Sequence, residues 1–409
     1  MAFQGNLLLD LKKSAHKPTP QKTKRAQSTR AQFCAAVSRT PTEPLLENED
    51  YLTKQILTYI GNKRSLLKFI TKGIQRVQKR LGKDKLDVFD VFSGSGIVTR
   101  YFKRFSNNLL VNDLEKYSNI TNECYLANTT DINLPELQSI YRHLLDTIST
   151  HPLIEGFITE LYAPKDDDHI QEGERVFYTH RNAMYIDTMR QLIDRVDFPL
   201  QKFFLAPLLS QASVHANTSG MFKGFHKNPA TGIGQFGGGN RDALLRIKGE
   251  ITLPFPVFSN FQCNSVIYNG DSNEIIKIAP EVDLAYLDPP YNQHPYGSNY
   301  FMLNLILKNE RPESVSKISG IAEGWNRSAY NKKQFAYEVL SELVKNIKAK
   351  YVLISFNSEG FISLGEMKTM LTQVGKVDVL ETNYNTFRGC RNLANRRIHV
   401  EEYLYLLEK

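Results

Sequence analysis

Short apolar segments alternate with amphipathic segments along most of the chain. Between Ser65 and Leu81, apolar residues recur every three or four positions with basic residues between them, which predicts an amphipathic helix. An apolar run that ends in a glycine turn follows over Leu86–Gly96, then a helical segment, then a second apolar run over Asn107–Glu115. A strand, a turn, a helix and a strand in this order predict a βαβ unit and a parallel sheet.

The alternation breaks between residues 125 and 260, where helical segments mix with loops rich in Gly and Asn. A segment of this size inside an α/β core is more typical of a separate domain than of one long loop. We therefore predict a doubly wound α/β domain built from residues 50–124 and 261–409, with a largely helical domain inserted over 125–260. The resumed pattern predicts strands near 265–271, 282–288, 351–357, 376–384 and 398–408, with helices near 334–350 and 361–372.

Residues 1–45 are rich in Lys, Thr, Gln, Ser and Ala and show little periodicity, so we expect a disordered arm. Of the formal net charge of +8, residues 1–40 supply +7, from eight basic residues against Asp10. Basic arms of this kind often lie on phosphate backbones, although a solvated tail without a partner explains the same composition.

The remaining composition favours a soluble intracellular protein. The hydrophobic content is 41%, and no apolar run reaches the roughly 18 to 20 residues that cross a bilayer. The four cysteines are scattered singly, without a Cys-x-x-Cys pair or a histidine spacing that would indicate zinc. We therefore expect no metal site and no disulfide framework.

The first glycine turn, "DVFSGSG", has features of a ligand site. It contains Asp90, Phe92, Gly94 and Gly96, and the second predicted strand ends at Asp113. Glycines at such a turn let a ligand approach the backbone, and an acidic strand end can accept hydrogen bonds from ribose hydroxyls. A dinucleotide site would add a third glycine, which is absent, so the pattern favours a nucleoside cofactor without a pyrophosphate, such as S-adenosylmethionine. Turn glycines and an acidic strand end without any ligand remain the alternative.

The tetrapeptide "DPPY" (Asp288 to Tyr291) follows an apolar strand and resembles the catalytic motif of N-methyltransferases that use S-adenosylmethionine. The amino group of adenine is a poor nucleophile because its lone pair is delocalised into the ring. Asp288 can accept one N–H, and the carbonyl of Pro289, held by Pro290, can accept the other. Tyr291 offers a ring face on which the base can stack. This arrangement would promote catalysis by positioning and by charge placement.

Further motifs resemble the DNA-adenine methyltransferases of the Dam-like, D12 class. "YIGNKRSLL" resembles the N-terminal cofactor motif of that class, which places Tyr59 and Lys63 at the cofactor, and "YNGDSNEII" places Asp271 near its adenine. "ANTSGMFKGFHKN" and the closing segment are similar to the FokI-like branch, which is associated with type IIS restriction enzymes. The resemblance implies a mostly parallel, seven-stranded, Rossmann-like fold. It also implies that Asp90, Phe92, Gly94, Gly96, Asp113 and Asp288 border the cofactor.

An adenine in duplex DNA must be flipped out of the stack before it can be methylated, at a cost of a few kcal/mol. A DNA-gripping region is therefore required, and the insertion over 125–260 is the candidate target-recognition domain. Its residues Asn217, Ser219, Lys223 and Lys227 offer base-edge and phosphate partners. A surface loop and a solvated charge run are the alternatives. In the basic loop before the last strand we expect four further DNA contacts, from Arg388, Arg391, Arg396 and Arg397.

The sequence thus predicts a site-specific DNA methyltransferase that forms N6-methyladenine with S-adenosylmethionine as donor. Double-stranded DNA is the expected partner, and the protein is expected in the cytoplasm of a bacterium or a phage-infected cell, associated with the nucleoid. A restriction-modification system with an independently acting cognate endonuclease is the expected context. RNA adenine and the N4 of DNA cytosine stay open as substrates, although cytosine-N4 enzymes usually have Ser where Asp288 stands. A nucleic-acid-binding subunit without turnover is a further alternative.

Overall fold

The computed structural model describes residues 45–238, 243–385 and 399–409. The predicted basic arm over residues 1–45 therefore lies outside the described residues, apart from Leu45. Contacts within the chain group Leu45–Lys409 into one compact unit.

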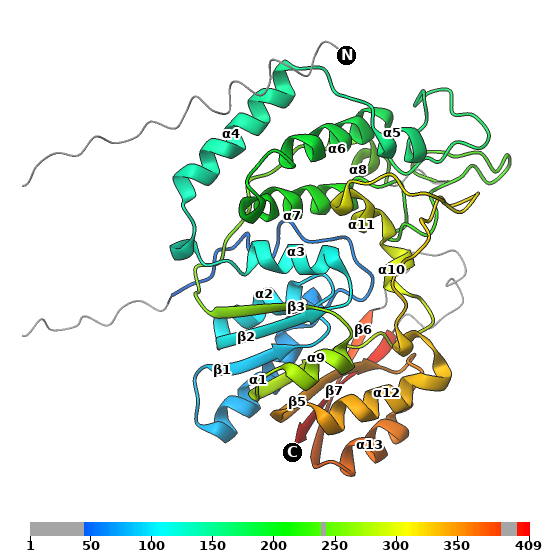
Figure 1. Ribbon diagram of the computed structural model, residues 1–409. Helices are drawn as coiled ribbons and strands as arrows, with labels where there is room; N and C mark the ends of the chain where they lie inside the picture. The colour runs from blue at the N-terminus through cyan, green and yellow to red at the C-terminus, as the bar shows by residue number, and fades with distance from the viewer. Residues whose placement is uncertain (1–44, 239–242, 386–398) are drawn as a thin grey trace, which may run out of the picture. The chain divides into compact units, whose positions relative to one another are not determined.

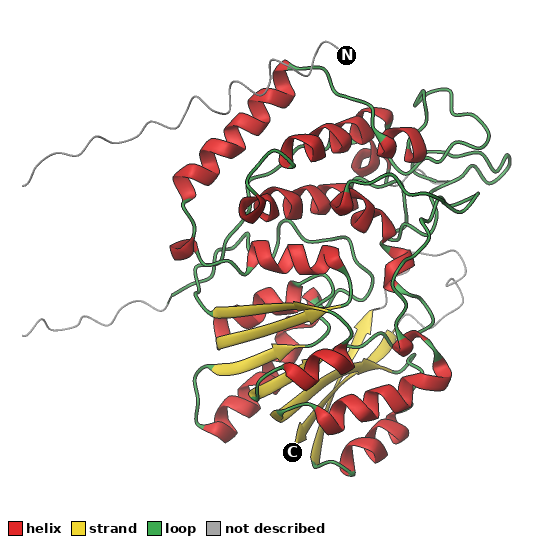
Figure 2. Ribbon diagram, viewed as in Figure 1, coloured by secondary structure: helices red, strands yellow, loops and turns green. Residues whose placement is uncertain are grey.

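The centre of this unit is a sheet of seven strands (Figures 1 and 2). The strands are β1 Leu86–Asp90, β2 Ser106–Asp113, β3 Asn264–Asn269, β4 Val282–Leu287, β5 Ala349–Asn357, β6 Lys376–Asn385 and β7 His399–Glu408. They lie in the order β3-β2-β1-β4-β5-β7-β6. Strands β1 to β5 pair in parallel, and β7 is antiparallel to both β5 and β6. The predicted α/β fold with a mostly parallel seven-stranded sheet is confirmed.

Helices cover both faces of the sheet. Those outside the insertion are α1 Leu67–Leu81, α2 Ile97–Phe102, α3 Lys116–Tyr125, α9 Ser272–Ile278, α10 Tyr296–Asn299, α11 Phe301–Lys308, α12 Lys333–Asn346 and α13 Leu364–Thr372, with short 3₁₀ turns at Arg64–Leu66, Lys103–Phe105 and Ala329–Asn331. A further 3₁₀ turn, Thr129–Asp131, lies within the insertion. Val88 and Leu284 face the cluster of α1 and α2, whereas their chain neighbours Phe89 and Ala285 face that of α9, α12 and α13. Apolar residues on both faces of a strand are what a parallel sheet between two helical layers requires.

The insertion consists of helices that pack on the outer side of α3. They are α4 Leu134–Thr150, α5 Phe157–Tyr162, α6 His180–Ile193, α7 Phe198–Val214 and α8 Leu244–Lys248. Helix α7 contacts α3, α6 and α11, and Figure 1 shows α3, α7 and α6 stacked in this order away from the sheet. Because α7 is apolar around most of its circumference, it is buried between these neighbours. The insertion therefore shares a hydrophobic core with α3 and α11.

The observed boundaries differ from the predicted ones mainly at element ends. The helix expected near residues 334–350 ends at Asn346, because Ala349 already pairs with Val282 in the ladder between β5 and β4. The amphipathic helix expected from Ser65 begins with a 3₁₀ turn before α1. No helix in the described ranges is long and apolar enough to cross a membrane.

Candidate active site

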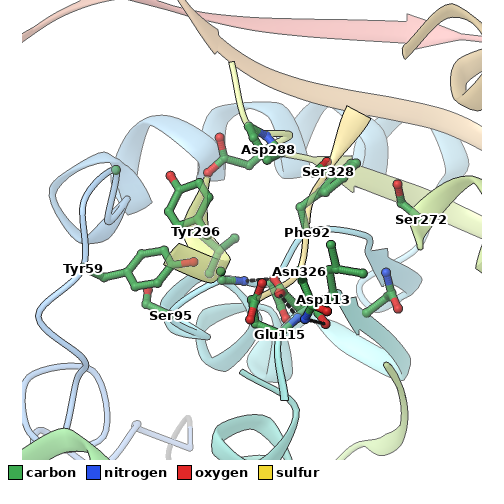
Figure 3. A pocket seen from close by; sticks show the side chains of 18 of the residues that line it. Tyr59, Phe92, Ser95, Asp113, Glu115, Ser272, Asp288, Tyr296, Asn326 and Ser328 are labelled. Atoms are coloured by element: carbon green, nitrogen blue, oxygen red, sulfur yellow. Dashed lines mark hydrogen bonds between the residues drawn. The ribbon is translucent and has the colours of Figure 1, made fainter. Parts of the chain in front are cut away.

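The candidate site is a pocket at the carboxyl ends of β1 and β4 (Figure 3). These two strands are neighbours, but the chain runs from β1 outward to β2 and β3 before it returns to β4 on the other side. Side-chain-lined crevices form at such a reversal of strand order in open α/β sheets. The pocket encloses about 870 Å³ of empty space, part of which is open to solvent.

The sequence-predicted cofactor residues mostly gather in this pocket. Those that line it are Tyr59, Lys63, Phe92, Gly94, Asp113, Asp271 and Asp288. Asp90 and Gly96 are not among the lining residues. Asp90 is 1% exposed and accepts a hydrogen bond from the Thr99 hydroxyl, and a β-carbon at Gly96 would stand 2.9 Å from the Asn122 side-chain oxygen. Asp90 and Gly96 therefore stabilise the glycine turn without contributing to the surface of the pocket.

The glycine turn is held by the end of the neighbouring strand. Gly94 has a φ of 52°, a left-handed conformation that favours glycine, and its N–H donates to Asp113 Oδ2 at 2.7 Å. The second oxygen of Asp113 accepts from the backbone N–H of Glu115 at 2.9 Å. The Asp113 carboxylate thus fixes both the glycine turn at Gly94 and the turn at Glu115 that follows β2.

Acidic side chains dominate the wall around Asp113. Burial raises the pKa of Asp113 to about 6, and burial together with the nearby Asp113 raises the pKa of Glu115 to about 7. Glu115 accepts a hydrogen bond from Asn304 Nδ2 at 2.7 Å. Asp271 caps the first turn of α9 by accepting from the N–H of Asn273. The sequence reasoning missed Glu115, although its place two residues after the predicted strand end was a usable signal.

Asp288 lies across the pocket from Asp113 and Glu115 in Figure 3. Its Oδ1 is 3.3 Å from the ammonium of Lys63, and its side chain is 18% exposed. Burial raises the pKa of Asp288 to about 6, although the Lys63 ammonium opposes this shift. The Lys63 ammonium also donates to Glu402 Oε1 at 2.8 Å. Burial would lower the pKa of Lys63, but Asp288 and Glu402 outweigh it and hold that pKa well above 10.5.

The two other predicted catalytic residues, Pro289 and Tyr291, do not line the pocket, whereas Pro290 does. Pro289 is buried, directly after Asp288. The ring of Tyr291 packs edge-on against Phe356, with centroids 5.7 Å apart, and lies 5.4 Å from the Lys63 ammonium. Their roles at the substrate stay predictions.

An aromatic cluster that the sequence reasoning did not predict forms another wall. Tyr59 stacks on Tyr300 with ring centroids 4.5 Å apart and on Tyr296 at 5.0 Å. Its hydroxyl lies 3.2 Å from that of Tyr117. Tyr296 lines the pocket, and its hydroxyl donates to the carbonyl of Ile60. The sequence signal for Tyr296 was weak, because it consisted only of a tyrosine five residues beyond Tyr291.

The outer rim comes from the segment between α11 and α12. Asn326, Ser328 and Asn331 line the pocket from this segment. Asn326 Nδ2 donates to the carbonyl of Leu114, and Asn331 Nδ2 donates to the carbonyl of Asn292. The rim is therefore tied both to the end of β2 and to the residues that follow the Asp288 motif.

Comparison with known proteins identifies the family. Residues 59–370 match the model of the D12 class of N6 adenine-specific DNA methyltransferases. The chain belongs to this family. It is 31% identical over 363 residues to the type II methyltransferase M.NlaIII of Neisseria lactamica, covering 86% of this chain and 99% of that protein. M.CviAII of Paramecium bursaria Chlorella virus 1 is 30% identical, and the alignment covers 85% of this chain and 97% of the length of M.CviAII. M.FokI of Planomicrobium okeanokoites is 27% identical over 86% of this chain and 53% of its own, so FokI-like relatives are present.

Membership of this family makes the chain an adenine-specific DNA methyltransferase, whose activity requires a methyl donor and a DNA substrate. The pocket fits a cationic donor that carries hydroxyl groups. Asp113, Glu115, Asp271 and Asp288 present carboxylates to it, and Lys63, the basic residue among its lining, is already paired with Glu402.

Four of the predicted DNA contacts of this methyltransferase, Asn217, Ser219, Lys223 and Lys227, lie in the segment that follows α7. Asn217 is fully buried, and its side chain bonds to the backbone of Val176, Gln235 and Gly237, so in this conformation it supports the loop and offers no atom to a base. Ser219 is half-buried, and Lys223 and Lys227 are exposed. Arg388, Arg391, Arg396 and Arg397 lie outside the described residues.

Proposed function

We propose that this DNA methyltransferase transfers a methyl group from S-adenosylmethionine to the N6 of an adenine flipped from duplex DNA at a specific site. The observation that carries the proposal is the arrangement of Asp288 opposite the acidic wall of one pocket. In this arrangement a cationic donor and an amine can meet at the end of β4.

Asp113, Glu115 and Asp271 are the residues that would hold the donor. Their carboxylates suit the ribose hydroxyls and the positive charges of S-adenosylmethionine. Burial is the main cause of the raised pKa values of Asp113 and Glu115, and a bound cation would stabilise their ionised forms. When bound, S-adenosylmethionine supplies an electrophilic methyl group on a sulfonium.

Asp288 would act on the amine of the target base. Its ionised carboxylate accepts one N–H of the amino group, and the carbonyl of Pro289 accepts the other. Both contacts favour a more pyramidal nitrogen, whose lone pair would form the new N–C bond while the bond between the methyl group and the donor's sulfur breaks and its electron pair stays on sulfur. The nitrogen then releases one proton, which Asp288 can take because its pKa of about 6 lies near neutral pH.

The insertion over residues 125–260 would provide target recognition. Lys223 and Lys227 are exposed and suit phosphate contacts, and Ser219 suits a base edge. The arm over residues 1–45 and the four arginines before β7 would add further phosphate contacts.

A restriction-modification system is the biological setting we propose. M.NlaIII and M.CviAII are both type II methyltransferases, and the alignments cover nearly their whole length. This chain would then methylate the site that a cognate endonuclease cleaves, and the two enzymes would act independently.

Purified protein incubated with labelled S-adenosylmethionine and a set of duplexes tests this function. We expect label in N6-methyladenine within one sequence context, and none in cytosine or in RNA. Asp288→Ala should abolish transfer while donor and DNA binding persist. Near-normal transfer by that variant, or unlabelled adenine in every duplex, would contradict the proposal.

A further inference from the structure

Glu402 is a buried acid to which neither the sequence nor the proposed function assigns a role. It lies on β7, is 1% exposed and stands opposite Asn357 in the ladder between β7 and β5. Its Oε1 accepts from the Ser355 hydroxyl at 2.9 Å and from the Lys63 ammonium at 2.8 Å. A buried carboxylate is destabilising unless it is paired, so Lys63 and Ser355 supply the partners that Glu402 needs.

Lys63 connects Glu402 to the site. Its ammonium is within 2.8 Å of Glu402 and within 3.3 Å of Asp288, and the Lys63 side chain is 5% exposed. The shorter distance belongs to Glu402, so the lysine is bonded chiefly to the buried acid and more loosely to Asp288. Glu402 and Asp288 therefore compete for one cation.

We propose that Glu402 is a positioning residue, which holds the Lys63 ammonium where it orients Asp288 without occupying the oxygen that accepts the substrate amine. The inference rests on the proposed function, because it requires Asp288 to be the acceptor. Without the charge of Glu402, Lys63 would move onto Asp288 and form a close ion pair there. That ion pair would occupy a lone pair of Asp288 and lower its basicity, so Asp288 would be a weaker acceptor for the substrate amine.

The charges around Asp288 give this arrangement a measurable signature. The charged and titratable groups that interact with it are Lys63, Glu402, Asp90, Tyr286 and Tyr296, and Tyr291 in turn interacts with Lys63. Lys63 lowers the pKa of Asp288, and Glu402 raises it. Loss of the Glu402 charge should therefore lower this pKa, both directly and by releasing Lys63 toward Asp288.

The test compares Glu402→Gln with Glu401→Gln in single-turnover methyl transfer between pH 5 and 8. Glutamine keeps an oxygen acceptor for Lys63 and Ser355 but removes the charge. Glu401 is the exposed neighbour on β7, so its variant removes the same charge outside the network. For Glu402→Gln we expect a fall of about 10- to 100-fold in the rate. We also expect the acid limb of the pH–rate profile to shift to lower pH. The affinity for the donor should stay within about threefold of that of the unmodified enzyme.

A rate and an acid limb that match those of Glu401→Gln would overturn the inference. If Glu402→Gln does not fold, Ser355→Ala provides the test, since it removes the hydroxyl that orients Glu402 and keeps the charge. A reduced rate with an unshifted acid limb is then expected, and an unchanged rate overturns the role.

Asp288→Asn, measured in parallel, separates this inference from the proposed function. Activity in Asp288→Asn would refute the acceptor role itself. An inactive Asp288→Asn beside a Glu402→Gln that behaves like Glu401→Gln would refute only the role of Glu402.

Discussion

Gly297 lies directly against the backbone of Asn326. A β-carbon at position 297 would stand 2.5 Å from the carbonyl oxygen of Asn326 and 2.9 Å from its nitrogen. Backbone atoms cannot rotate away as a side chain can, so any larger residue must displace the rim that Asn326 and Ser328 form over the pocket. The absence of a side chain at Gly297 is thus a condition for a closed rim.

Gly297→Ala should therefore weaken donor binding by about tenfold, because the rim is no longer prearranged for the donor. The melting temperature should fall as well, because the added β-carbon overlaps backbone atoms. Gly365→Ala is the matched control, since a β-carbon there meets nothing within 4 Å. Calorimetric titration with S-adenosylmethionine measures both variants. Equal affinities for the two would show that the rim does not contribute to the donor site.

The buried carboxyl groups predict that the ligand-free protein loses stability as pH rises. Burial raises the pKa of Asp90 to about 7, and the pKa values of Asp113, Glu115 and Asp288 are raised to between about 6 and about 7. Because these values exceed the unfolded values of about 4, the folded state binds protons more tightly. The resulting stabilisation is complete below pH 4 and is lost as pH rises through 6 and 7.

Melting temperatures measured at pH 6 and pH 8 check this expectation. The ligand-free protein should melt at a lower temperature at pH 8, and Asp90→Asn should reduce the difference. A saturating cationic donor should reduce it as well. A melting temperature that rises from pH 6 to pH 8 would contradict the prediction.

Lys223 and Lys227 should bind DNA phosphates. Removing one lysine that neutralises a phosphate reduces the slope of log affinity against log salt by about 0.9, so the double alanine variant should flatten the slope by about 2 without changing which sequence is methylated. Lys345 and Lys368, exposed on α12 and α13, form the control pair. Identical slopes for the two double variants would show that Lys223 and Lys227 do not contact DNA phosphates.

The sequence allowed the central sheet and part of the site to be predicted because their signals are local. The apolar run of β4 ends directly at Asp288, and Lys63 belongs to a short motif with Tyr59. Glu402 could not be predicted, since its partner Lys63 is 339 positions away and only the fold brings the two together. Asn326 lies in a segment without periodicity, so no pattern placed it at the pocket.

Asn217 shows a different limit of sequence reasoning. An asparagine in a loop rich in Gly and Lys has the same composition whether it reaches DNA or ties the loop together. Its complete burial and its bonds to Val176, Gln235 and Gly237 follow from tertiary packing. Amide side chains serve both purposes equally well, and only the fold decides between them.

The burial of α7 has a consequence for redesign of sequence specificity. Since α7 packs on α3 and on α11, and α11 follows closely after the Asp288 motif, an exchange of the whole insertion between relatives would strip apolar surface from the catalytic half. The segment between α7 and α8 carries Lys223 and Lys227, and it contributes Ala216 and Phe222 to that shared core. Grafts confined to this segment that keep Ala216 and Phe222 are the more promising route to new target sequences.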